Sequence, residues 1–221
     1  KDPELKEAFD LNEDIHTRTD ILNRPGKVLV GTKIPRRQAM ILHVILSFIG
    51  VVLGFYVSFH IGIPLLGFIF LLISGMLWFY STTYKRQFLI GNLLVAIMTG
   101  LVPLMVILFE LPELNKAYGD ILIDYNTDLM YIFYWVAGFS IFAFLTNLMR
   151  EIVKDMEDFE GDRIYGRNSV PVVLGIRNAK IIVTGLIIIT LFLLLYVYFS
   201  YLGDPITLIY FSLFLFLPFL F

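Results

Sequence analysis

An acidic stretch at 150–163, REIVKDMEDFEGDR, follows directly on one of the most apolar runs of the chain. It holds nine charged residues in fourteen positions, and six of them are acidic. If the preceding helix continues through it, five polar side chains recur three or four residues apart and share one face: Asn147, Glu151, Asp155, Asp158 and Asp162. Crowded carboxylates repel one another unless a cation lies among them, and Mg²⁺ takes one or two carboxylates together with substrate phosphates. The spacing therefore predicts a Mg²⁺ site at Asp155, Asp158 and Asp162.

Basic side chains are interleaved with these carboxylates. They are able to hold phosphate oxygens, because guanidinium and ammonium groups form charge-assisted hydrogen bonds with phosphate: Arg150, Lys154, Arg163 and Arg167. The alternative is a solvated helix end, with acids in water and basic residues that anchor the helix at a membrane surface.

A second polar segment, LNEDIHTRTDILNRP, begins at residue 11. It places Asn12, His16 and Asp20 at spacings of four, with Glu13 and Asp14 beside them. This pattern is weak by itself, since a histidine such as His16 is more often a helix-surface residue than a metal ligand.

The elements that position these residues are membrane helices. Of the 221 residues, 58% are hydrophobic and 16% charged, against roughly 45–50% apolar and about 25% charged in soluble domains. Six apolar runs approach the roughly 20 residues that a spanning helix needs: about 39–59, 62–80, 88–109, 129–149, 181–201 and 206 onward. Helix is the expected state, because a backbone in lipid must satisfy its own hydrogen bonds. We therefore expect an all-α, polytopic transmembrane bundle. The scattered basic residues do not indicate nucleic acid.

The connections between the runs predict an orientation. Sixteen of the 17 Lys and Arg residues lie before residue 38, at 85–86 and at 150–180, and alternating crossings put these three segments on one side. The opposite side has only Lys116, in an acidic loop expected at 110–128. The positive-inside rule makes the basic side cytoplasmic. Both acidic segments then share one interface, which favours a binding site over a solvated helix end.

Three motifs resemble the UbiA-type intramembrane prenyltransferases. REIVKDMEDFEGDR, followed by YGRNSVPVVLG, resembles the second aspartate-rich motif of that family. NEDIHTRTDILNRPGKVLVG is similar to the first motif, and YSTTYKRQFLIGNLLVA is similar to the link between the fourth and fifth helices. The three keep the family's order and spacing over most of the chain.

The resemblance implies a bundle of about nine helices, of which the six runs here are the third to the eighth. Residues 1–221 would then be a single transmembrane prenyltransferase domain that lacks the first helix, most of the second, and the last. The implied activity is transfer of a prenyl group from an isoprenoid diphosphate, which two motifs hold through Mg²⁺ at the cytoplasmic face of a cell membrane.

The resemblance also assigns site residues by position. Asn12 and Asp20 in the first motif, with Asp155, Asp158 and Asp162 in the second, would hold the metal; Asp20 and the three second-motif aspartates are the catalytic candidates. Substrate contacts would come from these residues: Asn12, Arg24, Lys85, Asn92, Arg150, Lys154 and Arg163. Two positions depart from the family, since Glu13 and His16 stand where aspartates are usual. Tyr80 precedes Lys85 by five residues rather than the family's four, so it receives no role.

The acceptor and the function have several alternatives. The second motif is most similar to family members that attach geranylgeranyl to geranylgeranylglyceryl phosphate. Relatives prenylate aromatic acceptors such as 4-hydroxybenzoate or a naphthoate in quinone synthesis. Two other readings are an inactive homologue, suggested by Glu13 and His16, and a transporter. Transporters carry ionisable groups near the bilayer midplane, whereas the acids here cluster at one interface. The sequence does not indicate an oligomeric state.

Overall fold

The predicted all-α membrane bundle is confirmed. The structure is a computed structural model and describes residues 34–84, 87–125 and 128–216. Within these ranges, five helical segments are long and apolar enough to cross a membrane. They contain α2 (Arg36–Ile61), α3 (Gly67–Thr82, after a 3₁₀ turn at Pro64–Leu66), α4 (Ile90–Asp124), α5 (Met130–Glu157) and α8 (Ile176–Val197). These five match the first five apolar runs of the sequence.

Shorter helices complete the described chain. Two lie between α5 and α8, namely α6 (Phe159–Ile164) and α7 (Val170–Leu174). The sixth apolar run is also helical, as α9 (Pro205–Tyr210) followed by a π-helical turn at Phe211–Phe216, and a second π-helical turn at Tyr198–Leu202 ends α8. The helix α9 begins where the Asp204 carboxylate accepts a hydrogen bond from the Thr207 amide at 2.7 Å, as an N-cap residue does.

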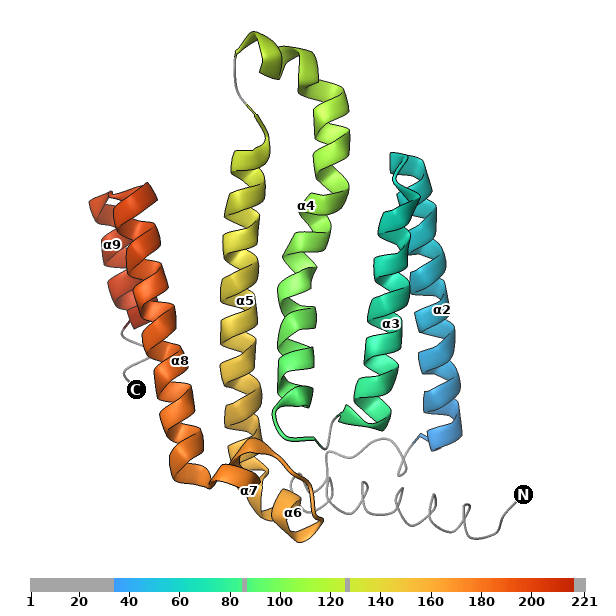
Figure 1. The fold of residues 1–221 in the computed structure, drawn as a ribbon, viewed down its shortest axis with the longest axis vertical. Coiled ribbons are helices and arrows are strands. Elements are labelled where there is room, and N and C mark those ends of the chain that lie inside the picture. The colour runs from blue at the N-terminus through green and yellow to red at the C-terminus, as the bar shows by residue number, and fades with distance from the viewer. Residues whose placement is uncertain (1–33, 85–86, 126–127, 217–221) are drawn as a thin grey trace.

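The helices α4 and α5 form the central pair of the molecule (Figure 1). They approach closely at Gly100, where a Cβ atom would lie 3.0 Å from the backbone oxygen of Ser140. Small residues permit such approach in lipid, where helices associate by packing and not by the hydrophobic effect. A buried cluster then ties this pair to α7 and α8: Ala96, Leu148, Ile152, Val170 and Ala179.

The helices α2 and α3 form a second pair beside α4 (Figure 1). Their contact is reciprocal, because Phe70 of α3 packs against Gly54 of α2 and Phe55 of α2 packs against Gly67 of α3. The turn between them contains Gly62, whose φ of 87° is a left-handed conformation that ends α2 and is accessible mainly to glycine.

The prediction of a loop at 110–128 is wrong for most of these residues. The helix α4 continues through them to Asp124, with Pro103 and Pro112 inside the helix. The segment after Pro112 contains the helix formers Leu, Glu, Lys and Ala, and Lys116 attaches it to the end of α2 through a 2.7 Å hydrogen bond to the Ile61 carbonyl oxygen. The charge of this segment suggested a loop, but it belongs to one face of a helix.

Candidate functional site

The acidic stretch continues α5 beyond its apolar run, as expected. The helix passes Met149 and ends at Glu157, so Asn147, Glu151 and Asp155 share one face. The prediction that Asp162 belongs to the same stripe is wrong, because the helix breaks at Asp158 and resumes as α6. Asp158 has φ −86° and ψ 4°, which is outside the helical region, and the break changes the direction of the residues that follow.

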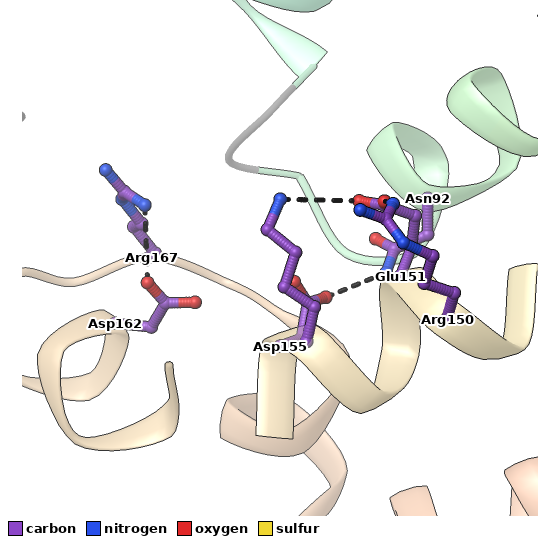
Figure 2. Close-up of polar contacts among 7 residues, drawn as sticks. Asn92, Arg150, Glu151, Asp155, Asp162 and Arg167 are labelled. Atoms are coloured by element: carbon purple, nitrogen blue, oxygen red, sulfur yellow. Dashed lines mark hydrogen bonds and ion pairs between the residues drawn. The ribbon is translucent and has the colours of Figure 1, made fainter. Parts of the chain in front are cut away.

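A hydrogen bond between α4 and α5 joins two of the predicted site residues (Figure 2). The Asn92 amide nitrogen Nδ2 donates to Oδ2 of Asp155 at 2.8 Å. Asn92 is buried in the first turn of α4, three residues after Leu89, whose φ of 60° is unusual for a residue other than glycine. Such backbone strain, about 1–3 kcal/mol, persists only where surrounding structure holds it. Here the strained residue, Leu89, immediately precedes the helix that presents Asn92 to Asp155.

One turn before Asp155 in α5, Glu151 is a buried carboxylate paired with two cations. Its Oε1 lies 2.7 Å from Nη1 of Arg150 and its Oε2 lies 3.6 Å from Nζ of Lys154. The Glu151 side chain is only 8% exposed, whereas those of Arg150 and Lys154 are 69% and 36% exposed. The cationic groups are therefore attached to a fixed anion and still reach solvent.

Asp162 forms a separate buried ion pair on α6 (Figure 2). Its Oδ1 lies 3.3 Å from Nη1 of Arg167, and the Arg167 amide donates to the Asp162 carbonyl oxygen at 2.9 Å. Burial raises the pKa of the Asp162 carboxyl, with the nearby Arg167 guanidinium opposing that effect. The Asp162 charge also acts on Asp155, so the two carboxylates belong to one electrostatic region.

The remaining predicted residues divide into two groups. Asp158 is half-buried at the junction of α5 and α6, and Arg163 is exposed on α6. Within the described ranges, no hydrogen bond or ion pair joins Arg163 to Asp155 or Asp162. Four predicted residues lie outside the described residues, together with Glu13, Asp14 and His16: Asn12, Asp20, Arg24 and Lys85.

Two side chains at this end were not among the predicted site residues. Glu151 shared the polar stripe, and its burial depends on packing that spacing does not reveal. Tyr80, in the last turns of α3, is half-buried and interacts electrostatically with Glu151, Asp155 and Arg167. Its position agrees with the predicted topology, in which the end of α3 lies on the side of the acidic stretch, although the irregular spacing from Lys85 had left Tyr80 without a role.

The carboxylates are compatible with Mg²⁺ in their chemistry. Over the described part of the chain, no three His, Cys, Asp or Glu side chains lie close enough together to hold a metal by themselves. Mg²⁺ keeps several waters and is commonly bound by one or two carboxylates plus substrate phosphates. Asp155 on α5 and the buried, charge-perturbed Asp162 on α6 suit a metal that a diphosphate would help to hold.

Comparison with known proteins supports the same assignment. Three relatives are digeranylgeranylglyceryl phosphate synthases. That of Methanosphaera stadtmanae is 33% identical over 190 residues, covering 85% of this chain and 61% of the relative. Those of Methanothermobacter thermautotrophicus and Thermococcus sibiricus are 27% and 29% identical, covering 81% and 77% of this chain and 55% and 52% of the relatives.

The chain thus spans between 52% and 61% of the length of these relatives. No solved structure matches it. The model of the UbiA prenyltransferase family matches residues 7–221, nearly the whole chain. With both family motifs that the structure describes meeting at one end of a membrane helix bundle, the chain belongs to the UbiA prenyltransferase family.

Proposed function

We propose that the protein transfers a geranylgeranyl group from geranylgeranyl diphosphate to geranylgeranylglyceryl phosphate, and that residues 1–221 form one transmembrane prenyltransferase domain. The observation that carries this proposal is the Asn92–Asp155 hydrogen bond. It joins the helix that follows the basic 85–86 pair to the second aspartate-rich motif, at an end of the bundle that also presents Arg150 and Lys154. The family and the names of the relatives supply the reaction class and the acceptor.

The carboxylates of the second motif would hold the metal in this reaction. Asp155, Asp158 and Asp162, with Asn12 and Asp20 from the first motif, would bind Mg²⁺, which neutralises negative charge on a leaving diphosphate. Asn92 fixes the Asp155 carboxylate through Oδ2. The other oxygen, Oδ1, would be the one that binds a metal, and the hydrogen bond already restricts the conformation of the side chain that carries it.

The basic residues would hold the diphosphate itself. Glu151 restrains Arg150 and Lys154 while leaving their charged ends partly exposed, which favours contact with phosphate oxygens. Arg24, Lys85 and Arg163 are the further substrate contacts in this proposal. As the bond from the allylic carbon to the diphosphate oxygen breaks, the acceptor hydroxyl oxygen bonds to that carbon, and its proton passes to the departing diphosphate or to water. The charge that develops on the diphosphate is largest at that moment, so pre-positioned cations act there.

The apolar surfaces of the membrane helices suit both isoprenoid tails. The acceptor has a phosphate head and a lipid tail. The head would lie at the polar end of the bundle and the tail along its apolar helices. In our proposal the polar end faces the cytoplasm, because sixteen of the 17 Lys and Arg residues lie on that side of the predicted topology.

The test is product formation by the full-length protein with labelled geranylgeranyl diphosphate and Mg²⁺. We expect a labelled ether lipid with geranylgeranylglyceryl phosphate and no product with 4-hydroxybenzoate. A product only with the aromatic acid would overturn the acceptor and leave the reaction class intact. No product with either acceptor, from protein that still binds diphosphate, would indicate an inactive homologue.

A binding measurement tests the site independently of turnover. We expect the paired substitution Asp155→Ala and Asp158→Ala to abolish Mg²⁺-dependent binding of geranylgeranyl diphosphate. Glu157→Ala is the matched control, since Glu157 is an exposed acid on the same helix end and should leave binding unchanged. Undiminished binding by the double variant would contradict the site.

A further inference from the structure

The helix α4 is longer than a membrane crossing requires. Its 35 residues extend over about 52 Å at a rise of about 1.5 Å per residue, whereas the apolar core of a bilayer is about 30 Å thick. The surplus lies at the end opposite the candidate site, because Asn92 is in the first turn of α4. This end of α4 must therefore leave the apolar core or turn along its surface.

Lys116 shows where α4 reaches the membrane surface. Its Nζ donates to the Ile61 carbonyl oxygen at 2.7 Å and lies 2.6 Å from Oε1 of Glu113. Ile61 is the last residue of α2, a helix that crosses the same membrane. The residues of α4 after Lys116 consequently begin at the level where α2 ends, and Figure 1 shows the last turns of α4 lying across the top of the molecule toward α5.

These last turns have one apolar and one polar face. The apolar side chains recur three or four residues apart and so share one face: Leu114, Tyr118, Ile121, Leu122 and Tyr125. The opposite face carries the charges and a single isoleucine: Glu113, Lys116, Asp120, Ile123 and Asp124. Tyr118, Ile121 and Tyr125 are 52%, 53% and 77% exposed to their surroundings. In the described part of the chain, little protein covers the apolar face.

Aromatic residues of α5 and of the turn that ends α8 lie at the same end of the bundle. Tyr131 and Trp135, near the start of α5, have ring centres 6.0 Å apart, and Trp135 lies 5.9 Å from Tyr201 in the turn that ends α8. Tyrosine and tryptophan concentrate where the apolar core meets the headgroups. Tyr118 and Tyr125 therefore extend an aromatic belt at the same end of the bundle.

We propose that residues 113–125 form an interfacial anchor on the membrane surface opposite the candidate site. Tyr118, Ile121 and Tyr125 enter the boundary between headgroups and acyl chains, while Asp120 and Asp124 face water, the arrangement typical of an amphipathic helix lying in the interface. The acidic polar face fits a neutral or zwitterionic lipid surface better than an anionic one. The anchor would fix the height of the α4–α5 pair, which carries Asn92 and Asp155 at its other end.

Two isoleucines provide a matched test. Ile121 and Ile123 are both exposed, at 53% and 78%, but they project from opposite faces of the same helix. None of the 221 residues is a cysteine, so Ile121→Cys and Ile123→Cys each give one labelling site in this part of the full-length protein. Each variant is nitroxide-labelled in phosphatidylcholine vesicles, and collisions with oxygen and with a water-soluble nickel chelate are measured by power saturation.

Lipid, water and protein give different results in this measurement. We expect the label at Ile121 to collide mainly with oxygen, with a ratio of oxygen to nickel collisions several-fold higher than at Ile123. A label at Ile121 reached equally by nickel would place the face in water and overturn the proposal. A label shielded from both reagents would show that protein covers it, which overturns the proposal equally. Tyr118→Cys and Asp120→Cys form a second pair that decides the question if either isoleucine variant fails to fold.

Discussion

At the scale of single residues, the site is organised around one amide. Asn92 is the only described side chain that donates a hydrogen bond to Asp155, and it comes from a different helix. A hydrogen bond to a charged group contributes about 1.5–3 kcal/mol, and loss of its donor leaves the acceptor to be desolvated without compensation. Asn92 therefore matters for the direction in which Asp155 points as well as for the packing of α4 on α5.

Replacement of Asn92 tests this role. We expect Asn92→Ala to weaken Mg²⁺-dependent diphosphate binding at least tenfold, because Asp155 would no longer be held toward the metal. Titration calorimetry of the full-length protein measures the change. Asn115→Ala is the control, since Asn115 is exposed at the other end of the same helix and its loss should leave the affinity unchanged. Equal affinities of wild type and Asn92→Ala would contradict a positioning role for this amide.

Asp162 predicts a particular dependence of stability on pH. Burial raises the pKa of its carboxyl in the folded protein, so the unfolded chain releases this proton at a lower pH than the folded one. The contribution of Asp162 to the free energy of unfolding therefore falls as the pH rises from the ordinary carboxyl pKa, about 3.9, to the raised pKa of Asp162 in the folded protein. In metal-free buffer we expect Asp162→Asn to lose less stability across that window than wild type. Parallel stability curves from thermal unfolding would show that the carboxyl is not perturbed.

Residue spacing predicted much of this site, and there is a physical reason why it could not predict the rest. Asn147, Glu151 and Asp155 share a face because α5 does continue past Met149. The position of Asp162 was not predictable, because one residue, Asp158, leaves the helical conformation and separates α5 from α6. For the same reason, spacing could not distinguish Arg163, which is exposed, from Arg167, which pairs with Asp162.

At the scale of the elements, the α4–α5 contact determines whether Asn92 and Asp155 meet. Gly100 lies two turns beyond Asn92, and an added Cβ there would be 3.0 Å from the Ser140 oxygen and 3.2 Å from Cβ of Phe144. The oxygen belongs to the helix backbone, so relief requires the two helices to separate. Hydropathy located both helices in the sequence, but it contains no information on which pair packs closely.

A pair of glycine substitutions tests this contact. We expect Gly100→Ala to destabilise the protein by about 1–3 kcal/mol, as overpacking does, and to weaken diphosphate binding by shifting Asn92. Gly138→Ala on α5 meets no atom within 4 Å, so the higher helix propensity of alanine should make it neutral or slightly stabilising. Thermal unfolding in detergent measures both. A Gly100→Ala variant as stable as Gly138→Ala would show that the helices are not held at this point.

At the scale of the whole molecule, hydropathy predicted the membrane-crossing helices well. The path of the chain beyond a crossing depends on contacts such as the one that Lys116 makes with the end of α2, which hydropathy does not contain. The five spanning helices coincide with five of the six runs. The error at 110–128 arose because acidic residues were taken as a loop, whereas Lys116 binds the end of α2 and the acids occupy one face of α4. An amphipathic helix at an interface and a charged loop have similar composition, and only the order of residues around the helix separates them.

The distribution of charge over the whole chain leads to a prediction of sidedness. In the topology predicted from the sequence, sixteen of the 17 Lys and Arg residues fall in segments on the side of the candidate site, and insertion retains such segments in the cytoplasm. Glu160 on α6 and Asp124 at the end of α4 are both exposed and lie at opposite ends of the bundle (Figure 1). In intact cells, we expect a membrane-impermeant maleimide to label Asp124→Cys of the full-length protein and to reach Glu160→Cys only after permeabilisation. Because both acids are exposed and the 221 residues contain no cysteine, a difference in labelling reports sidedness and not burial. Labelling of Glu160→Cys from outside would reverse the orientation and move the proposed diphosphate site away from the cytoplasm.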